Sequence, residues 1–167
     1  MNLVLIGYRG TGKSTVGKIL AERLKMPLVN LDDRIIAQAG MRIPEIVEKF
    51  GWDRFRDLES QVVVEVAKED NHVLDCGGGV ILREKNVAQL KKAGPVFWLQ
   101  ASIPTIVSRI KDDTQRPSLT GKSFTDEVAD VLREREPKYR AAADHVVDTE
   151  GKSVEQVAEE IIRLFEK

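Results

Sequence analysis

Near its amino end the chain reads Leu3-Val4-Leu5-Ile6-Gly7-Tyr8-Arg9-Gly10-Thr11-Gly12-Lys13-Ser14, an apolar run followed by the pattern G-x-x-x-x-G-K-[ST]. The apolar run suits a buried strand, and residues 15–24 have the spacing of a helix. Glycines let the backbone curl until successive N–H groups point inward at the positive end of the helix dipole. The stretch therefore predicts a strand, a phosphate-binding loop and a helix, in that order.

Two side chains of the loop carry its chemistry. Lys13 would reach the β- and γ-phosphates of a nucleotide, and the Ser14 hydroxyl would take one position on a Mg²⁺ that otherwise keeps waters and phosphate oxygens. A dinucleotide-binding fingerprint fits worse, because these glycines fall as G-x-x-G-x-G. A glycine-rich turn that binds nothing is the plainest alternative.

Composition limits the class of protein. The chain has 167 residues, enough for one domain with its own core but short for two. Its 26 basic and 27 acidic residues nearly balance, so no overall field favours nucleic acid or an anionic membrane. No targeting pattern follows Met1 and no apolar run approaches membrane-spanning length, so we expect a cytosolic protein, and we expect a monomer.

Cysteine and histidine usage point away from metal clusters and nucleophiles. Cys76 is the single cysteine of the sequence, which excludes an internal disulfide and a cysteine-based metal cluster, and a small buried residue is the favoured interpretation. His72 and His145 each precede an apolar, strand-like run, so surface or strand-edge positions are favoured over catalytic ones.

Besides the first run, four short apolar runs are strand candidates: residues 28–31, 73–76, 95–99 and 145–147. Helical patterns fill the intervals between them. Strands that alternate with helices predict an α/β fold with a five-stranded parallel sheet covered on both faces. Ligands of such sheets gather beyond the carboxyl ends of the strands, so the residues just after each strand are the candidates for a site.

Three other segments complete the expected organisation. Ser153 and Gln156 form a capping box that opens a structural helix at the carboxyl end. Residues 44–68 have a helical pattern interrupted at Gly51, which predicts two helices that meet at an angle and project from the sheet. Residues 111–123 lack periodicity and contain helix-breaking proline and glycine, so we expect an exposed loop there.

Carboxylates follow the second strand candidate, which ends in Asn30-Leu31-Asp32-Asp33. They lie beside the phosphate loop if the first two strands end on the same edge of the sheet. Asp32 could accept a hydrogen bond from a substrate hydroxyl and take its proton during phosphoryl transfer. Alternatively, Asp32 or Asp33 caps a helix that starts near Arg34.

The third strand candidate ends in Asp75-Cys76-Gly77-Gly78-Gly79. Three successive glycines cost backbone entropy, so either a tight turn demands them or a ligand lies against the bare backbone, and we favour the ligand. The apolar run followed by Asp75 resembles a Walker B element, whose carboxylate holds Mg²⁺, usually through water.

Arginines come from two later segments. Arg56 and Glu59 stand three residues apart, the phase at which helical side chains meet, and such a pair is most often a solvated surface ion pair. Arg135 and Arg140 would likewise be ordinary surface charges. Planar guanidinium groups are nevertheless the best clamps for carboxylate and phosphate.

Together these features resemble the shikimate kinases, a branch of the P-loop kinases related in fold to the nucleoside monophosphate kinases. The landmarks, in chain order, are Gly7 to Ser14, Asp32, Phe55-Arg56-Asp57-Leu58-Glu59, Gly77-Gly78-Gly79, Arg116-Pro117 and Arg135-Glu136-Pro137-Lys138-Tyr139. The resemblance covers nearly the whole chain. It implies a three-layer α/β/α fold in a single domain, with a substrate-binding helical region at about residues 32–62 and a mobile lid at about residues 111–123.

The resemblance also implies a reaction, the ATP-dependent phosphorylation of the 3-hydroxyl of shikimate, a step toward aromatic amino acids that uses Mg²⁺. The implied catalytic residues are Lys13, Asp32 as the base, and Arg116 on the lid. The implied ATP-binding residues are Gly10, Thr11, Gly12, Lys13, Ser14, Thr15, Arg109, Arg116 and Lys152. The implied substrate-binding residues are Asp32, Arg56, Gly77, Gly78, Gly79 and Arg135, with the two arginines on the carboxylate.

The chain departs from the family at the metal, for which Ser14 and Asp75, the latter through water, are the expected ligands. Many members have an acidic residue two places before the one matching Asp32, and this chain has Asn30 there. Asp75 stands where the family usually has Ser or Thr. We expect Asp75 to restore the missing carboxylate near Mg²⁺.

Three other functions stay open on the sequence. A gluconate kinase would share the phosphate loop and the lid but not the paired arginines. A nucleoside monophosphate kinase would contact a base and a phosphate in place of a carboxylate. A non-catalytic nucleotide-binding switch would use the same loop and change shape with the bound nucleotide, and fold-level likeness does not decide among these classes.

Overall fold

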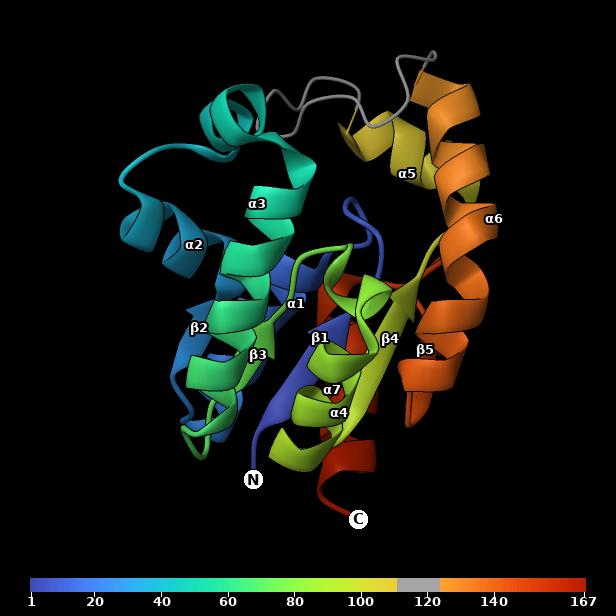
Figure 1. The fold of residues 1–167 in the computed structure, drawn as a ribbon. Helices are drawn as coiled ribbons and strands as arrows, with labels where there is room; N and C mark the ends of the chain where they lie inside the picture. Colours follow the sequence, from blue (N-terminus) through green and yellow to red (C-terminus); the bar gives the residue numbers. More distant parts are fainter. Residues whose placement is uncertain (111–123) are drawn as a thin grey trace.

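The computed structural model describes residues 1–110 and 124–167, with the backbone alone at 124 and 125 (Figure 1). Five parallel strands form one sheet in the order β2-β3-β1-β4-β5. The strands are β1 (Leu3–Ile6), β2 (Leu28–Asn30), β3 (Val73–Asp75), β4 (Val96–Gln100) and β5 (His145–Asp148). The expected sheet is confirmed, and each predicted strand end lies within one residue of the observed one.

Helices cover both faces of the sheet. Figure 1 shows α3 and α4 in front of the strands and α7 behind them. The helices are α1 (Lys13–Leu24), α2 (Leu31–Ala39), α3 (Ile43–Ala67), α4 (Glu84–Ala93), α5 (Ile103–Ile110), α6 (Phe124–Ala142) and α7 (Val154–Phe165), with a 3-10 turn η1 (Val80–Leu82). The three-layer α/β/α fold is therefore confirmed.

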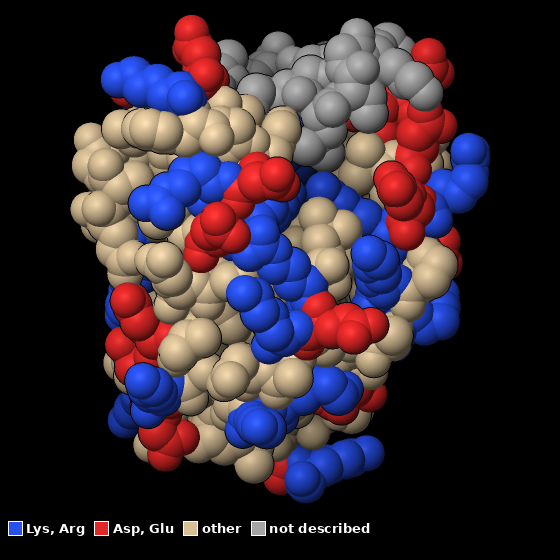
Figure 2. Space-filling model, viewed as in Figure 1, with Lys and Arg blue, Asp and Glu red and all other residues tan. Residues whose placement is uncertain are grey.

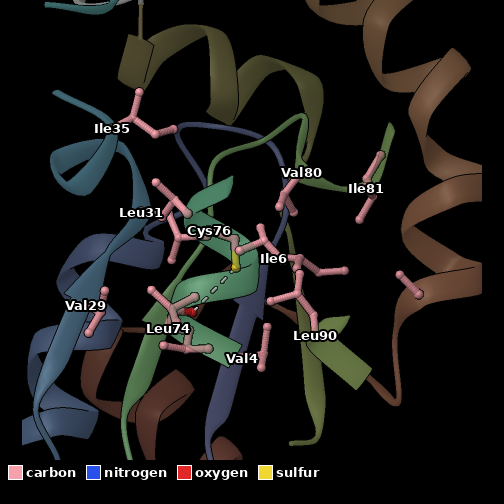
Figure 3. Packing of buried hydrophobic residues seen from close by; sticks show 14 of the residues in the cluster. Val4, Ile6, Val29, Leu31, Ile35, Leu74, Cys76, Val80, Ile81 and Leu90 are labelled. Atoms are coloured by element: carbon pink, nitrogen blue, oxygen red, sulfur yellow. Dashed lines mark hydrogen bonds between the residues drawn. The ribbon is translucent and has the colours of Figure 1, made fainter. Parts of the chain in front are cut away.

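The central strand explains why its sequence is apolar throughout. Val4 and Ile6 of β1 belong to a core cluster shared with α2, α3, α4 and α6, whereas Leu3 and Leu5 belong to a second cluster shared with α1 and α7. Successive side chains of a strand point to opposite faces, so a strand covered on both faces reads as a continuous apolar run. Figure 3 shows part of the first cluster, in which Cys76 is buried, and burial raises the pKa of its thiol.

Two local predictions about helices are confirmed. Gly51 interrupts α3 with a φ of 85° and a ψ of 169°, so the segment consists of two helices joined at a kink. The capping box opens α7, because Gln156 N donates to Ser153 Oγ at 3.1 Å and Ser153 N donates to Gln156 Oε1 at 2.8 Å.

One prediction about helix α2 needs correction. Asn30 is its N-cap, and the Asn30 side-chain oxygen accepts a hydrogen bond from Asp33 N at 3.0 Å. Asp32 and Asp33 lie in the first turn of the helix, so the alternative in which one of them is the cap is wrong. The helix begins at Leu31, directly after the strand, because the cap already belongs to β2.

The surface is mixed in charge. Figure 2 shows basic and acidic side chains interspersed over the visible face, in keeping with the formal net charge of −1. None of the helices within residues 1–110 and 124–167 is long and apolar enough to cross a membrane.

Candidate active site

The loop between β1 and α1 is shaped to receive an anion. Gly12 is the N-cap of α1 and has a φ of 92°, a left-handed conformation that glycine adopts without strain. Within the described chain, no side chain caps α1 and its first turn holds no acidic residue. The N–H groups and the positive end of the helix dipole therefore face the site uncompensated.

Lys13 lies over this loop and is nearly buried. Its Nζ donates to the carbonyl oxygen of Gly7 at 2.6 Å and to that of Tyr8 at 3.1 Å. These two bonds hold the ammonium group at the loop, beside the N–H groups at the start of α1. The arrangement can neutralise negative charge on a phosphate bound there.

A carboxylate stands next to the loop at the end of β3. Asp75 Oδ2 accepts hydrogen bonds from Ser14 Oγ at 2.8 Å and from Asn30 Nδ2 at 3.1 Å. The contact with Asn30 follows from the sheet, because Asn30 and Asp75 are register partners in the adjacent strands β2 and β3. The predicted proximity of Asp75 to Ser14 is thus present in the structure.

Burial dominates the electrostatics of this carboxylate. Asp75 is 4% exposed, and desolvation raises the pKa of its carboxyl group, opposed mainly by the positive charge of Lys13 and by the hydrogen bond from Ser14. The nearby carboxylate of Asp32 raises it further. A cation bound at this point would favour the charged form that burial disfavours.

A cavity of about 340 Å³ joins these groups. Its lining includes Lys13, Ser14, Asp32 and Asp75. Of the glycine turn, by which we mean Gly77, Gly78 and Gly79, the first two residues line the cavity. The expectation that the carboxyl ends of β1, β2 and β3 meet at one site is confirmed.

Arg56 of α3 is held against the glycine turn. Its Nη1 donates to Glu59 Oε1 at 3.0 Å, and its guanidinium carbon lies 5.0 Å from the Phe55 ring centroid and 5.5 Å from that of Trp52. A Cβ on Gly79 would lie 2.4 Å from the guanidinium nitrogens, so only glycine admits this contact. Arg56 and Glu59 are buried, and the interpretation of a solvated surface pair is wrong.

Arg135 of α6 approaches the same turn from the other side. It is 7% exposed, and its guanidinium carbon lies 6.0 Å from the ring centroid of Tyr8 in the phosphate loop. A Cβ on Gly78 would lie 3.5 Å from Arg135 Nη1 and 3.6 Å from Arg9 N. Arg135 is therefore not an ordinary surface charge, whereas Arg140 is exposed and pairs with Glu136 at 3.1 Å.

A second cavity, of about 230 Å³, adjoins the first behind the phosphate loop. It is lined by Thr11, Thr15, Arg109, Thr149 and Lys152 among others, and it shares Gly12, Thr15 and Arg109 with the first cavity. Arg109 Nη1 donates to the carbonyl oxygen of Gly10 at 3.0 Å. The residues expected near the nucleotide thus lie together.

A larger hollow, of about 530 Å³, opens between α5 and α6 beyond the ends of β4 and β5. Its carboxylates are already engaged by the protein. Glu150 accepts hydrogen bonds from Ser102 N at 2.9 Å and from Thr105 Oγ1 at 2.8 Å. Among the residues that the structure describes, this hollow shares no lining residue with the cavity beside the phosphate loop.

The structure brings together the predicted site residues that it describes. Arg116 and the expected lid at residues 111–123 lie outside the described residues. Sequence reasoning missed the roles of Asn30, which both caps α2 and holds Asp75, and of Tyr139, whose hydroxyl donates to the carbonyl oxygen of Gly78. The interval of four residues between Arg135 and Tyr139, one helical turn, indicates that these two residues share a helix face, but it does not indicate the contact with Gly78.

Known proteins of one family match this chain along nearly its whole length. The shikimate kinase family model matches residues 9–166. The shikimate kinase of Thermodesulfovibrio yellowstonii is 42% identical over 166 residues, which span 99% of this chain and 95% of the relative. The shikimate kinase of Geobacter sulfurreducens is 43% identical over 160 residues, which span 96% of this chain and 88% of the relative.

Solved structures agree with the sequence matches. The shikimate kinase from Acinetobacter baumannii in complex with shikimate superposes with a TM-score of 0.94 at 34% identity, over 98% of this chain and 91% of that one. The shikimate kinase from Aquifex aeolicus gives a TM-score of 0.86 at 33% identity, over 99% of this chain and 96% of that one. The chain belongs to the shikimate kinase family.

Proposed function

We propose that the cavity between the phosphate loop and the glycine turn is where this protein transfers the γ-phosphoryl group of ATP to the 3-hydroxyl of shikimate. The products are shikimate 3-phosphate and ADP, on the pathway to aromatic amino acids. The observation that carries this placement is the meeting of two nearly buried guanidinium groups, Arg56 and Arg135, at a bare glycine backbone beside the phosphate loop.

The two arginines suit a carboxylate on the acceptor. Guanidinium groups offer paired donors that match the two oxygens of a carboxylate, and their hydrogen bonds are stronger where water is excluded. Arg56 and Arg135 contact adjacent glycines, Gly79 and Gly78, so one planar acid group can reach both. A substrate ring would then lie along the glycine turn, with a hydroxyl directed toward Asp32.

The chemical step needs a base and charge neutralisation. As the shikimate oxygen forms its bond to the γ-phosphorus, the bond from that phosphorus to the ADP oxygen breaks and the hydroxyl proton passes to the Asp32 carboxylate. Lys13, held at the loop by two carbonyl oxygens, stabilises the negative charge on the phosphate oxygens. Arg116 is assigned to the same phosphates by the family resemblance alone.

The residues present also fit Mg²⁺, which supplies charge neutralisation on phosphate oxygens when it is bound. Mg²⁺ prefers oxygen ligands and keeps several waters, and Ser14 Oγ and Asp75 Oδ2 lie 2.8 Å apart beside the loop. In the described part of the chain, no three His, Cys, Asp or Glu side chains gather as a metal site of their own. Ser14 and Asp75, with Asn30 orienting the carboxylate, are therefore the proposed metal-binding residues.

The substitution Asp75→Ser tests whether Asp75 compensates for Asn30. We expect the Mg²⁺ concentration for half-maximal activity to rise about tenfold or more, as for other losses around a metal ligand. Mn²⁺ binding in the presence of ADP, measured by electron paramagnetic resonance, should weaken in parallel without any need for turnover. Unchanged Mg²⁺ dependence and Mn²⁺ affinity would show the compensation idea to be wrong.

A coupled assay of ADP release tests the reaction, with shikimate, gluconate and nucleoside monophosphates as acceptors. We expect turnover with shikimate, and we expect Arg56→Ala and Arg135→Ala each to raise its KM about tenfold to a hundredfold, because one charged partner of the carboxylate is lost. Transfer to gluconate or a monophosphate in place of shikimate, or unaltered saturation by shikimate in both variants, would contradict the assignment.

A further inference from the structure

The hydroxyl group of Tyr139 connects two parts of the acceptor site. Tyr139 is fully buried in α6, and its hydroxyl donates to the carbonyl oxygen of Gly78. Arg135, one helical turn earlier, lies against the same glycine, because a Cβ on Gly78 would be 3.5 Å from Arg135 Nη1. The Tyr139 hydroxyl and the arginine assigned to the carboxylate thus meet at one residue of the glycine turn.

The ring that carries this hydroxyl is fixed in place. Tyr139 stacks on Trp98 of β4, with ring centroids 5.6 Å apart and an interplanar angle of 22°. Phenylalanine could fill the same space, and a buried hydroxyl costs free energy unless it is hydrogen-bonded. The hydroxyl is therefore the part of Tyr139 that packing does not explain, and its hydrogen-bond partner, Gly78, belongs to the acceptor site.

The two acceptor arginines lie beside groups of different charge. Arg56 donates to the carboxylate of Glu59, which offsets part of its positive charge. Arg135 lies one helical turn from a phenol, and burial raises the pKa of Tyr139 to about 12 against the lowering effect of Arg135, so the phenol stays neutral at ordinary pH. The phenol therefore offsets none of the positive charge that Arg135 offers to an anionic ligand.

We propose that Tyr139 is a positioning residue, whose hydroxyl holds the Gly78 backbone against the Arg135 guanidinium and thereby sets the affinity for the shikimate carboxylate. The inference rests on the proposed function, which gives Arg135 that carboxylate to bind. The Tyr139 hydroxyl contacts Gly78 and is assigned no contact with substrate or phosphate, so its removal should act on acceptor binding and not on the chemical step.

The test begins with Tyr139→Phe, which keeps the ring and its stacking on Trp98. We expect the KM for shikimate, and its Kd measured by calorimetry without ATP, to rise about tenfold, while kcat and the KM for ATP change less than about twofold. Arg140→Gln is the matched control, because Arg140 lies on the same helix with its guanidinium carbon 5.2 Å from the Trp98 ring centroid, yet outside the acceptor site. It should leave all four constants unchanged.

A double-mutant cycle shows which residue Tyr139 acts through. In an Arg135→Ala background the effect of Tyr139→Phe on shikimate affinity should shrink to about twofold or less, whereas in an Arg56→Ala background it should persist in full. An equal effect in both backgrounds, or a rise in the KM for ATP as large as that for shikimate, would overturn the proposal. Failure of the wild-type protein to phosphorylate shikimate would instead overturn the proposed function, so the two failures are distinguishable.

Discussion

The donor and acceptor halves of the active site are built in different ways. The donor half is one unbroken stretch, Gly7 to Ser14, in which backbone N–H groups and a helix end receive the phosphates. The acceptor half is assembled from α2, α3, the glycine turn and α6, and it works through side chains such as Arg56 and Arg135.

This difference determines what each half depends on. The donor half needs local conformation, which eight successive residues specify by themselves. The acceptor half needs the packing of elements more than a hundred residues apart in the chain. Its geometry therefore depends on the residues that hold each arginine in position. Glu59 supports Arg56, and we propose that Tyr139 supports Arg135 through Gly78. The experiments below disturb the junction of the halves, then the acceptor half, then the carboxylate of Asp75 beside the donor half.

The largest effect is expected at Asp32, which lies where the two halves meet. Asp32→Asn removes the proposed base while keeping size, so kcat should fall by about 10² to 10⁴ with little change in the KM for ATP. Asp33→Asn is the matched control, because Asp33 carries the same charge in the same helical turn but is exposed. Steady-state kinetics with both substrates measures this. Equal losses in the two variants would remove Asp32 from the mechanism.

A smaller effect, confined to the acceptor half, is expected for Gly79→Ala. Gly79 has a φ of −96°, which alanine tolerates, but the added Cβ would lie 2.4 Å from the Arg56 guanidinium and push it aside. We expect the KM for shikimate to rise about tenfold, with the KM for ATP and the Tm nearly unchanged. Gly78→Ala should do less, because its Cβ would meet Arg135 at an ordinary 3.5 Å. The reverse ranking would contradict the proposed contacts.

The smallest effect is expected on stability, at the Asp75 carboxylate beside the donor half. Because the folded pKa of Asp75 is raised above its ordinary value of 3.8, the folded state holds the proton to higher pH than the unfolded state, and stability is lost as pH rises from 3.8 through the folded pKa. Asp75→Asn carries no such charge and should gain stability relative to the wild type as pH rises above 3.8.

Thermal melting without nucleotide or metal measures this gain, which should amount to a few degrees in Tm at neutral pH. Asp33→Asn serves again as the control, because its exposed carboxylate pays no comparable cost of burial. If the Tm of the wild type instead rose relative to the Tm of Asp75→Asn as pH rises, the charged Asp75 carboxylate would not be destabilising.

Much of the fold could be predicted because it follows from local patterns. The five apolar runs, the break at Gly51 and the capping box at Ser153 each have a short-range cause, and the strand ends were placed to within one residue. Leu31 was assigned to a strand although it begins α2, because its apolar side chain suits either element and the decision belongs to the cap at Asn30.

The surroundings of the arginines could not be predicted in the same way. Helical spacing shows that Arg56 and Glu59 meet, but not that the glycine turn and aromatic rings bury them. Likewise, the spacing of Arg135 and Tyr139 does not reveal that the hydroxyl also reaches Gly78. Burial of a charged pair depends on which element packs over it, and that information is distributed along the whole chain.

The sequence by itself therefore determined the phosphate loop, the order of strands and helices, and the identity of the polar residues that follow the strands. Those features depend on side-chain period and on the backbone freedom of neighbouring residues. Only the tertiary structure decided that Asn30 and Ser14 share one oxygen of Asp75 and that two arginines converge on Gly78 and Gly79. The physical reason is that such contacts join distant segments, whose approach is fixed by the packing of helices on the sheet.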